Sequence, residues 1–502
     1  MNRIRPGIAA WYGTVVFISS ACLLILEITA GRLLAPYIGV SLYTWTSIIG
    51  VILAGLSIGN WLGGRGADRG AGEITVGVVL GLSGVSTGSV LAWLVIVAPW
   101  VESQTFGLLG ASFFYVAVLF FLPSLLLGVV TPLLTALILK TDHRAGRVVG
   151  RMHALAATGS IAGTFLAGYW LVQAFGTRGI IIGTALVLGG LAVPFLLSKG
   201  RIILILAAAI ILVWLGAERA GGLVNPCTAE SRYYCIRVVD AGATRSLVLD
   251  HMLHSTNHRD EPELLVVPYV HAMDEIMSWF FRERPLQPRS IFFAGGGGYT
   301  HPRAIRDRAP WIDVVVAEID PLVTATAKSD LFVEPGQFQI HHEDGRRVLA
   351  KYEPGQFDVI VTDVFHDLAV PYHLTTLEYA GLVKSRLAAN GLYLLNVVDV
   401  FPDPLLVKAF IKTLRSEFQY VDVWMEPPPS QRSRITYVLS ASNTAPLPDV
   451  VTAATGLERS WYRVTDGLMR TGSALDALPV LTDDFAPVES LIAPLLVTRL
   501  GL

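Results

Sequence analysis

The strongest constraint on this chain is the series of apolar segments that fills its first 217 residues. They lie at 11–36, 41–62, 74–99, 107–139, 148–172, 176–197 and 202–216. A helix needs about 20 mostly apolar residues to cross a bilayer, and most of these segments reach that length. Residues 1–217 contain only 12 Lys and Arg and 5 Asp and Glu. We therefore expect a multi-pass α-helical domain of about seven segments in the cell inner membrane.

Basic residues are unevenly distributed among the loops of this domain. They precede the first segment or follow the second, fourth and sixth: Arg3, Arg5, Arg65, Arg69, Lys140, Arg144, Arg147, Arg151, Lys199 and Arg201. The alternate loops contain only Arg178. Loops rich in Lys and Arg stay in the cytoplasm, which predicts a cytoplasmic N-terminus.

Two polar features interrupt the apolar half. Glu27 and Arg32 lie within the first segment, and ionisable residues inside a membrane are functional candidates. A structural pair within or between helices is the alternative. The loop at 63–69, GGRGADR, resembles the cytoplasmic loop motif of major-facilitator transporters, although that motif is short and degenerate.

Residues 218–502 contain 26 basic and 35 acidic residues, the mixed charge of a soluble domain. The acidic balance argues against nucleic acid as a partner and suits a cationic substrate. Residues 218–285 are interpreted as a linker, a β-hairpin subdomain and a first helix. Strands are expected at 233–240 and 244–250, a polar loop at 251–260 and a helix at 263–281.

Residues 290–320 predict a nucleoside-binding βαβ unit. An apolar run at 291–294 ends in four glycines, a stretch of helix length follows, and a second apolar run ends in Glu318. Glycines let the backbone turn sharply and approach a ligand. An acid about 20 residues later can accept hydrogen bonds from the ribose hydroxyls.

Two further acids follow strand-like runs. Asp344 and Gly345 come after a short strand, and Asp363 ends the buried-type strand FDVIVTD. Ligands of open α/β sheets bind outside the carboxyl ends of the strands. Glu318, Asp344 and Asp363 are therefore expected on one rim.

The remaining pattern completes the sheet. Helices are expected at 374–388 and 404–417, and strands at 392–397, 421–425 and 435–440. Residues 286–502 are thus predicted to form a doubly wound, methyltransferase-type Rossmann-like domain. No Cys-x-x-Cys or His cluster has zinc spacing, so no metal is expected.

The side of the membrane that carries this domain is left open by the pattern. Seven spans from a cytoplasmic N-terminus would place it outside, where Cys227 and Cys235 could form a disulfide. A nucleoside cofactor, however, is made in the cytoplasm. The seventh segment is short and the fourth is broken by Pro123 and Pro132, so the cytoplasmic side is the expectation.

The ordered motifs of residues 228–445 resemble the spermidine synthase family, in its bacterial membrane-fused branch. The matching positions are Ser231–Tyr234, Leu249-Asp250, His254, Gly295-Gly296-Gly297, Glu318-Ile319-Asp320, Asp344-Gly345, Asp363 and Asp367. The resemblance implies transfer of an aminopropyl group from decarboxylated S-adenosylmethionine to putrescine or a related amine, with release of methylthioadenosine. It also implies that a homodimer is common.

The resemblance also implies roles for individual residues. Asp363 is the expected catalytic residue. The donor's nucleoside is expected to contact Gly295, Gly296, Gly297, Glu318, Asp344, Gly345 and Tyr234. The polyamine is expected to contact Asp367, His254, Asp250 and Tyr372.

Departures from the family pattern keep other functions open. Gly298 stands where the family has an aspartate that holds the donor's amine, and the Asp363–Asp367 spacing is one residue wider. An S-adenosylmethionine-dependent methyltransferase is one alternative. A transporter or sensor that binds a polyamine or nucleoside without turnover is the other.

Overall fold

The computed structural model describes residues 6–104, 106–282, 289–334, 336–364, 370–444 and 446–497. The chain divides into two compact units, Met1–Cys235 and Ile236–Leu502. Each is described by itself. The expected fold class, a helical membrane domain fused to an α/β domain, is confirmed.

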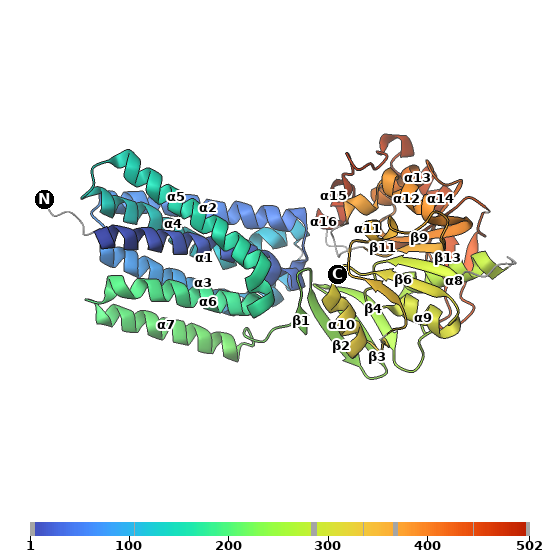
Figure 1. The fold of residues 1–502 in the computed structure, drawn as a ribbon, viewed down its shortest axis with the longest axis horizontal. Helices are drawn as coiled ribbons and strands as arrows, with labels where there is room; N and C mark the ends of the chain where they lie inside the picture. The colour runs from blue at the N-terminus through green and yellow to red at the C-terminus, as the bar shows by residue number, and fades with distance from the viewer. Residues whose placement is uncertain are drawn as a thin grey trace. The chain divides into compact units, whose positions relative to one another are not determined.

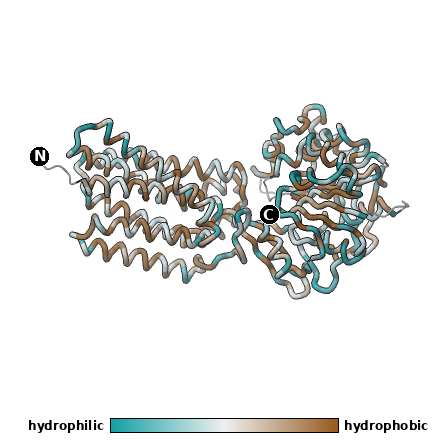
Figure 2. Tube along the Cα trace, in the orientation of Figure 1, coloured by the Kyte–Doolittle hydropathy of each residue, from teal (hydrophilic) through white to brown (hydrophobic). Residues whose placement is uncertain are grey.

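Seven helices of the first unit cover the seven apolar segments (Figure 1). They are α1 Pro6–Ile38, α2 Leu42–Asp68, α3 Glu73–Ser103, α4 Leu108–Leu139, α5 Ala145–Leu166, α6 Val172–Leu196 and α7 Gly200–Arg219. Hydrophobic residues run along most of their length (Figure 2). Six stretches within the described residues are long and apolar enough to cross a membrane.

One of these six stretches, Ala145–Leu196, contains both α5 and α6. Its 52 residues would extend about 78 Å as a straight helix, more than twice a bilayer core. A short π-helix, Ala167–Leu171, and Gly176, with φ 64°, break it. Figure 1 shows the chain turning back between α5 and α6. We therefore count this stretch as two crossings.

The two segments of doubtful length behave as ordinary spans. Helix α4 continues through Pro123 and Pro132 as a single helix of 32 residues, so it does not cross twice. Helix α7 has 20 residues, about 30 Å of helix. The apparent shortness of the seventh segment disappears because its helix extends beyond the apolar run at both ends.

The segment after α7 is tied to the helices. Cys227 and Cys235 form a disulfide, so the pairing considered from the sequence is present. The Arg32 side chain donates hydrogen bonds to the backbone carbonyls of Ser231 and Tyr233. Arg32 therefore has a structural partner in the linker, and no Arg32–Glu27 ion pair occurs among the described residues.

The second unit begins with an antiparallel sheet of β2 Cys235–Ala241, β3 Thr244–Leu249 and β4 Met252–His258. The expectation of a polar loop at 251–260 was wrong. Residues there form β4 because their backbone groups pair with β3, and Ser255 and Asn257 find partners elsewhere in the domain.

A nine-stranded sheet follows, in the order β12-β13-β10-β11-β9-β8-β5-β6-β7. Its strands are β5 Ser290–Ala294, β6 Asp313–Ala317, β7 Gln339–His341, β8 Phe357–Thr362, β9 Leu387–Phe401, β10 Tyr420–Met425, β11 Ser433–Ser442, β12 Val450–Thr452 and β13 Ser460–Arg463. Strands β5 to β9 pair in parallel, and β11 is antiparallel to β9 and β10. The expected late antiparallel pair is thus present.

The helices of this unit connect the strands and cover the sheet (Figure 1). They are α8 Pro268–Arg282, α9 Thr300–Arg308, α10 Pro321–Asp330, α11 Gly345–Leu349, α12 Leu377–Arg386, α13 Leu405–Leu414, α14 Thr465–Arg470, α15 Val488–Leu491 and α16 Ala493–Val497. The chain runs from β5 outward to β7 and returns to β8 on the other side of β5. That reversal is a topological switch point, where ligands of open α/β sheets bind.

Candidate active site

The glycine loop at the end of β5 is shaped by close backbone contact with the end of the neighbouring strand β8. Gly295 has φ 96°, and a Cβ at this position would lie 1.9 Å from the backbone oxygen of Asp363. Only glycine tolerates both the conformation and the contact. The loop therefore lies directly against the end of β8.

Glu318, at the end of β6, holds this loop from the other side. Its Oε2 accepts hydrogen bonds from the N–H groups of Gly296 and Gly297 at 2.9 and 3.0 Å, and its Oε1 accepts one from Asp320 at 2.9 Å. Burial raises the pKa of Glu318, although these three bonds oppose the shift. The structure thus brings Glu318 together with the predicted nucleoside loop.

Asp344 caps the short helix α11. Its Oδ1 accepts from the Arg347 N–H at 3.1 Å, and its Oδ2 lies 2.7 Å from His373 Nε2. A Cβ on Gly345 would lie 2.8 Å from the Ala294 Cβ. Gly345 therefore permits α11 to pack against β5.

Asp363 lies immediately after β8 at the switch point, and its side chain is half-buried. Its backbone N–H donates to the Ala294 carbonyl at 2.9 Å. Burial raises the pKa of this carboxyl to about 6, although Tyr269, His301 and Asn396 oppose the shift. A carboxylate of that pKa can accept a proton near neutral pH.

The Tyr269 hydroxyl donates to Asp363 Oδ2 at 3.1 Å. Burial, followed by the nearby carboxylate, raises the pKa of Tyr269 well above its usual value, so the phenol stays a donor. The sequence interpretation missed this residue. The available signal was a tyrosine directly after Pro268, within the helix predicted at 263–281.

A cluster of three polar side chains on α8 and α9 lies near the site. His301 Nε2 is 3.2 Å from Asp274 Oδ1, and the Asp274 carboxylate accepts hydrogen bonds from Arg308 at 2.6 and 2.9 Å. Burial alone would raise the pKa of Asp274, but His301 and Arg308 hold it below its usual range. These three residues were also missed, since they become neighbours only when the helices pack.

The space beside the fourth glycine of the loop, Gly298, is already filled by a neighbouring side chain. A Cβ on Gly298 would lie 2.5 Å from the Ser255 Cβ. Its N–H donates to Ser255 Oγ at 2.9 Å, and its carbonyl accepts from Asn257 Nδ2 at 2.7 Å. Strand β4 therefore fills the position where the family resemblance implies an acidic side chain.

Other predicted residues lie at different distances from this centre. The backbone carbonyl oxygen of His254 lies 3.4 Å from the Tyr269 hydroxyl oxygen. Asp250 is buried at the β3–β4 turn, with φ 55°, and its carbonyl accepts from Arg237 at 2.9 Å. Tyr372 is 55% exposed.

Two of the predicted site residues cannot be placed in this site. Tyr234 lies in the Met1–Cys235 unit, where its N–H donates to Ser231 Oγ at 2.8 Å. Asp367 lies outside the described residues. Within the described ranges, no group of three His, Cys, Asp or Glu side chains could hold a metal ion.

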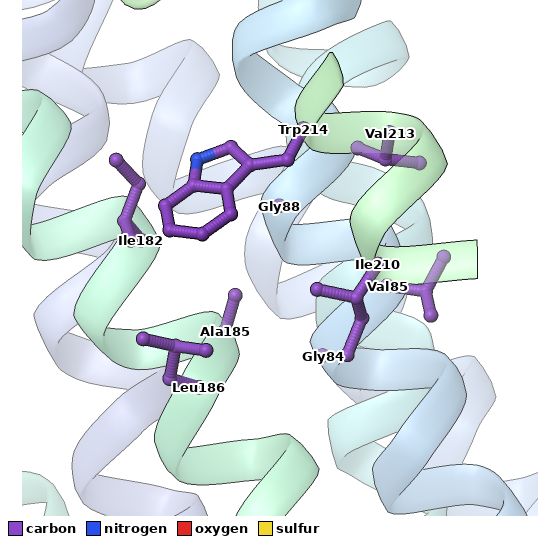
Figure 3. Close-up of a pocket in the computed structure, with 9 residues that line it drawn as sticks. All are labelled: Gly84, Val85, Gly88, Ile182, Ala185, Leu186, Ile210, Val213 and Trp214. Carbon is purple, nitrogen blue, oxygen red and sulfur yellow. The ribbon is translucent and has the colours of Figure 1, made fainter. Parts of the chain in front are cut away.

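A small apolar cavity also occurs in the helical unit, between α3, α6 and α7. Its lining includes Gly84, Gly88 and Ala185, and Figure 3 shows the Trp214 ring extending from α7 toward α6. Its described lining has no acidic or basic side chain. This cavity offers no group for acid–base chemistry.

No family model matches the chain. It is 25% identical over 218 residues to a probable polyamine aminopropyl transferase of Bifidobacterium longum, which covers 40% of this chain and 48% of that protein. It is 28% identical over 113 residues to a polyamine aminopropyltransferase of Vibrio vulnificus, which covers 22% and 38%. The chain thus spans about half the first relative's length and less of the second. These similarities support the resemblance to the spermidine synthase family that the sequence motifs indicated.

Solved structures include a probable spermidine synthase from Corynebacterium glutamicum, with 21% identity and a TM-score of 0.44 over 49% of this chain and 93% of that one. Human methyltransferase-like protein 13 in complex with SAH has 21% identity and a TM-score of 0.31 over 45% and 99%.

Proposed function

We propose that the Ile236–Leu502 unit of this membrane-bound chain is an aminopropyltransferase of the spermidine synthase type. It transfers an aminopropyl group from decarboxylated S-adenosylmethionine to an amine and releases methylthioadenosine. The observation that carries the proposal is Asp363, a half-buried carboxylate at the switch point with a pKa of about 6. Similarity to two aminopropyltransferases supports it.

The donor's nucleoside is assigned to the glycine loop and its neighbours. Backbone at 295–297 approaches the ligand because no side chains intervene. Glu318 directs a carboxylate at the same loop, and its remaining lone pairs accept hydrogen bonds from the ribose hydroxyls. Asp344 and Gly345 lie at the adjoining strand end and are assigned to the adenine.

The chemistry needs a neutral amine, because a protonated nitrogen has no lone pair. Free alkyl amines have a pKa of about 10.4 and are protonated at neutral pH. The amine nitrogen forms a bond to the propyl carbon while the carbon–sulfur bond breaks. The electron pair of the broken bond stays on sulfur, so the positively charged sulfonium becomes a neutral thioether. Asp363 takes the proton that the nitrogen releases, and Tyr269 holds that carboxylate in place.

The test is methylthioadenosine release by the detergent-purified full chain, supplied with decarboxylated S-adenosylmethionine and a panel of amines. We expect amine-dependent release that falls at least about 100-fold in Asp363→Asn, the usual contribution of a general base. Equal release by both proteins would contradict the role of Asp363. The control is Asp358→Asn, at the other end of the same strand.

A methyltransferase is the second candidate because of one observation. Gly298 and Ser255 fill the position at which an acid would hold the donor's amine. The same assay with S-adenosylmethionine separates the candidates by product. Methyl transfer releases S-adenosylhomocysteine, whereas aminopropyl transfer releases methylthioadenosine.

A further inference from the structure

A tight turn near the C-terminus packs beside α12. Residues 482–485, with the sequence Thr-Asp-Asp-Phe, form this C-terminal turn. The backbone groups of Thr482 and Phe485 pair in both directions at 3.0 Å. The Asp483 N–H donates a hydrogen bond to the Glu378 carboxylate on α12 at 3.0 Å. The C-terminal turn is therefore closed on itself and anchored to a helix of the same unit.

The Asp483 side chain extends from this turn to α11. Its two carboxylate oxygens accept hydrogen bonds from the two terminal nitrogens of Arg346, each at 2.7 Å. Oδ1 also accepts one from the hydroxyl of Thr376, the N-cap residue of α12, at 2.7 Å. A paired guanidinium–carboxylate contact fixes direction as well as distance. Asp483 therefore holds the Arg346 guanidinium in one orientation, although 137 residues separate the two in the chain.

The guanidinium in turn holds a histidine beside the proposed nucleoside site. Arg346 Nη1 donates to the backbone carbonyl of His373 at 2.9 Å, and His373 Nε2 lies 2.7 Å from Asp344 Oδ2. A carboxylate only accepts hydrogen bonds, so Nε2 carries the hydrogen. Asp344 is the carboxylate assigned to the adenine. A continuous series of contacts thus joins the C-terminal turn to the proposed adenine site.

The exposure of the ion pair points to a role in positioning. The side chains of Arg346 and Asp483 are 24% and 42% exposed, and ion pairs this exposed add little to the free energy of unfolding. A carboxylate that recognises a base, by contrast, must be held to within about 0.5 Å by the groups behind it.

We infer that Arg346 and Asp483 are positioning residues, which act through His373 to aim the Asp344 carboxylate at the amino group of the donor's adenine. This inference rests on the proposed assignment of the nucleoside to Asp344. It gives the C-terminal turn a part in donor binding.

The experiment measures methylthioadenosine binding to the detergent-purified full chain by calorimetry, with no amine present. We expect Asp483→Asn to weaken binding about tenfold, the loss that follows when one hydrogen bond to a charged group is misaligned. Asp483→Glu keeps the carboxylate and should recover part of the affinity. The Tm of Asp483→Asn should stay within about 3 °C of the unaltered chain, because the pair is exposed.

Turnover separates positioning from chemistry. In Asp483→Asn the KM for the donor should rise by the same factor as the dissociation constant, whereas kcat and the KM for the amine should stay unchanged. The matched control is Asp449→Asn, which breaks another aspartate–arginine pair of the same unit, with Arg463. It should leave methylthioadenosine binding unchanged.

A double substitution tests the route through the histidine. His373→Gln alone should weaken methylthioadenosine binding, and the addition of Asp483→Asn should weaken it little further. Both changes interrupt the same series of contacts, so their effects on the binding free energy should not add.

Three results would overturn the inference: unchanged binding in Asp483→Asn, full additivity with His373→Gln, or a fall in Tm of more than about 5 °C, which would mean that the pair acts through the fold. If methylthioadenosine binds but no amine gives turnover, the proposed reaction fails, whereas the binding of the variants still decides the inference. An unaltered chain that binds neither methylthioadenosine nor S-adenosylhomocysteine would overturn it together with the nucleoside assignment.

Discussion

The Tyr269 hydroxyl, in the first turn of α8, donates a hydrogen bond to Asp363 at the end of a strand 94 residues later. This bond stabilises the charged form of the carboxylate, whereas burial favours the neutral form. The balance places the pKa of Asp363 at about 6. The proposed base is therefore largely deprotonated at pH 7.

Tyr269→Phe should shift the pH profile. The proposed reaction needs deprotonated Asp363, so its rate should rise with pH through that pKa. Removal of the hydroxyl takes away a stabiliser of the carboxylate and raises the pKa, which moves the acidic limb to higher pH. The measurement is kcat/KM for methylthioadenosine release between pH 5 and 9. An unchanged limb, together with a changed KM only, would mean that Tyr269 acts in binding alone.

Gly298→Ala should destabilise the Ile236–Leu502 unit. The added Cβ would lie 2.5 Å from Ser255, and such overpacking costs about 1–3 kcal/mol. Thermal unfolding should show a lower Tm, and Ser255→Gly in the same chain should restore part of it. Gly467→Ala is the matched control because a Cβ there meets nothing within 4 Å. Equal Tm values for the two alanine variants would contradict the packing.

Asp274→Asn should also lower the Tm. It leaves the Arg308 guanidinium and His301 without their carboxylate, and breaking a buried pair costs about 3 kcal/mol or more. Because the folded-state pKa of Asp274 is depressed, its stabilisation is present above about pH 4 and is lost as the pH falls. The exposed Asp313→Asn is the control. A difference in Tm between the two variants that does not shrink at low pH would contradict the ion-pair account.

Thiol counting tests the disulfide and the side of the membrane. The denatured, unreduced protein should take up one maleimide, on Cys22, and three after reduction. Disulfides persist mainly in oxidising compartments, so this result would place the segment after α7 outside the cytoplasm. Three reactive thiols without reduction, in protein purified under thiol-blocking conditions, would instead support the cytoplasmic side expected from the sequence.

Local pattern was enough for much of the fold. The apolar segments predicted the helices of the membrane unit, and the strand–glycine–helix–strand–acid order predicted β5, α9 and β6. Strand β4 and the β12–β13 hairpin escaped prediction. Their side chains alternate weakly, and their pairing depends on strands that are distant in sequence or on the other side of a turn.

The sequence by itself determined the architecture and nominated Asp363, Glu318 and the glycines, because backbone conformation and strand ends leave local signals. The tertiary structure decided which groups surround them. Tyr269 meets Asp363, and Ser255 fills the space beside Gly298, only because separate strands and helices pack together. Such contacts depend on distances across the fold, which no local pattern encodes.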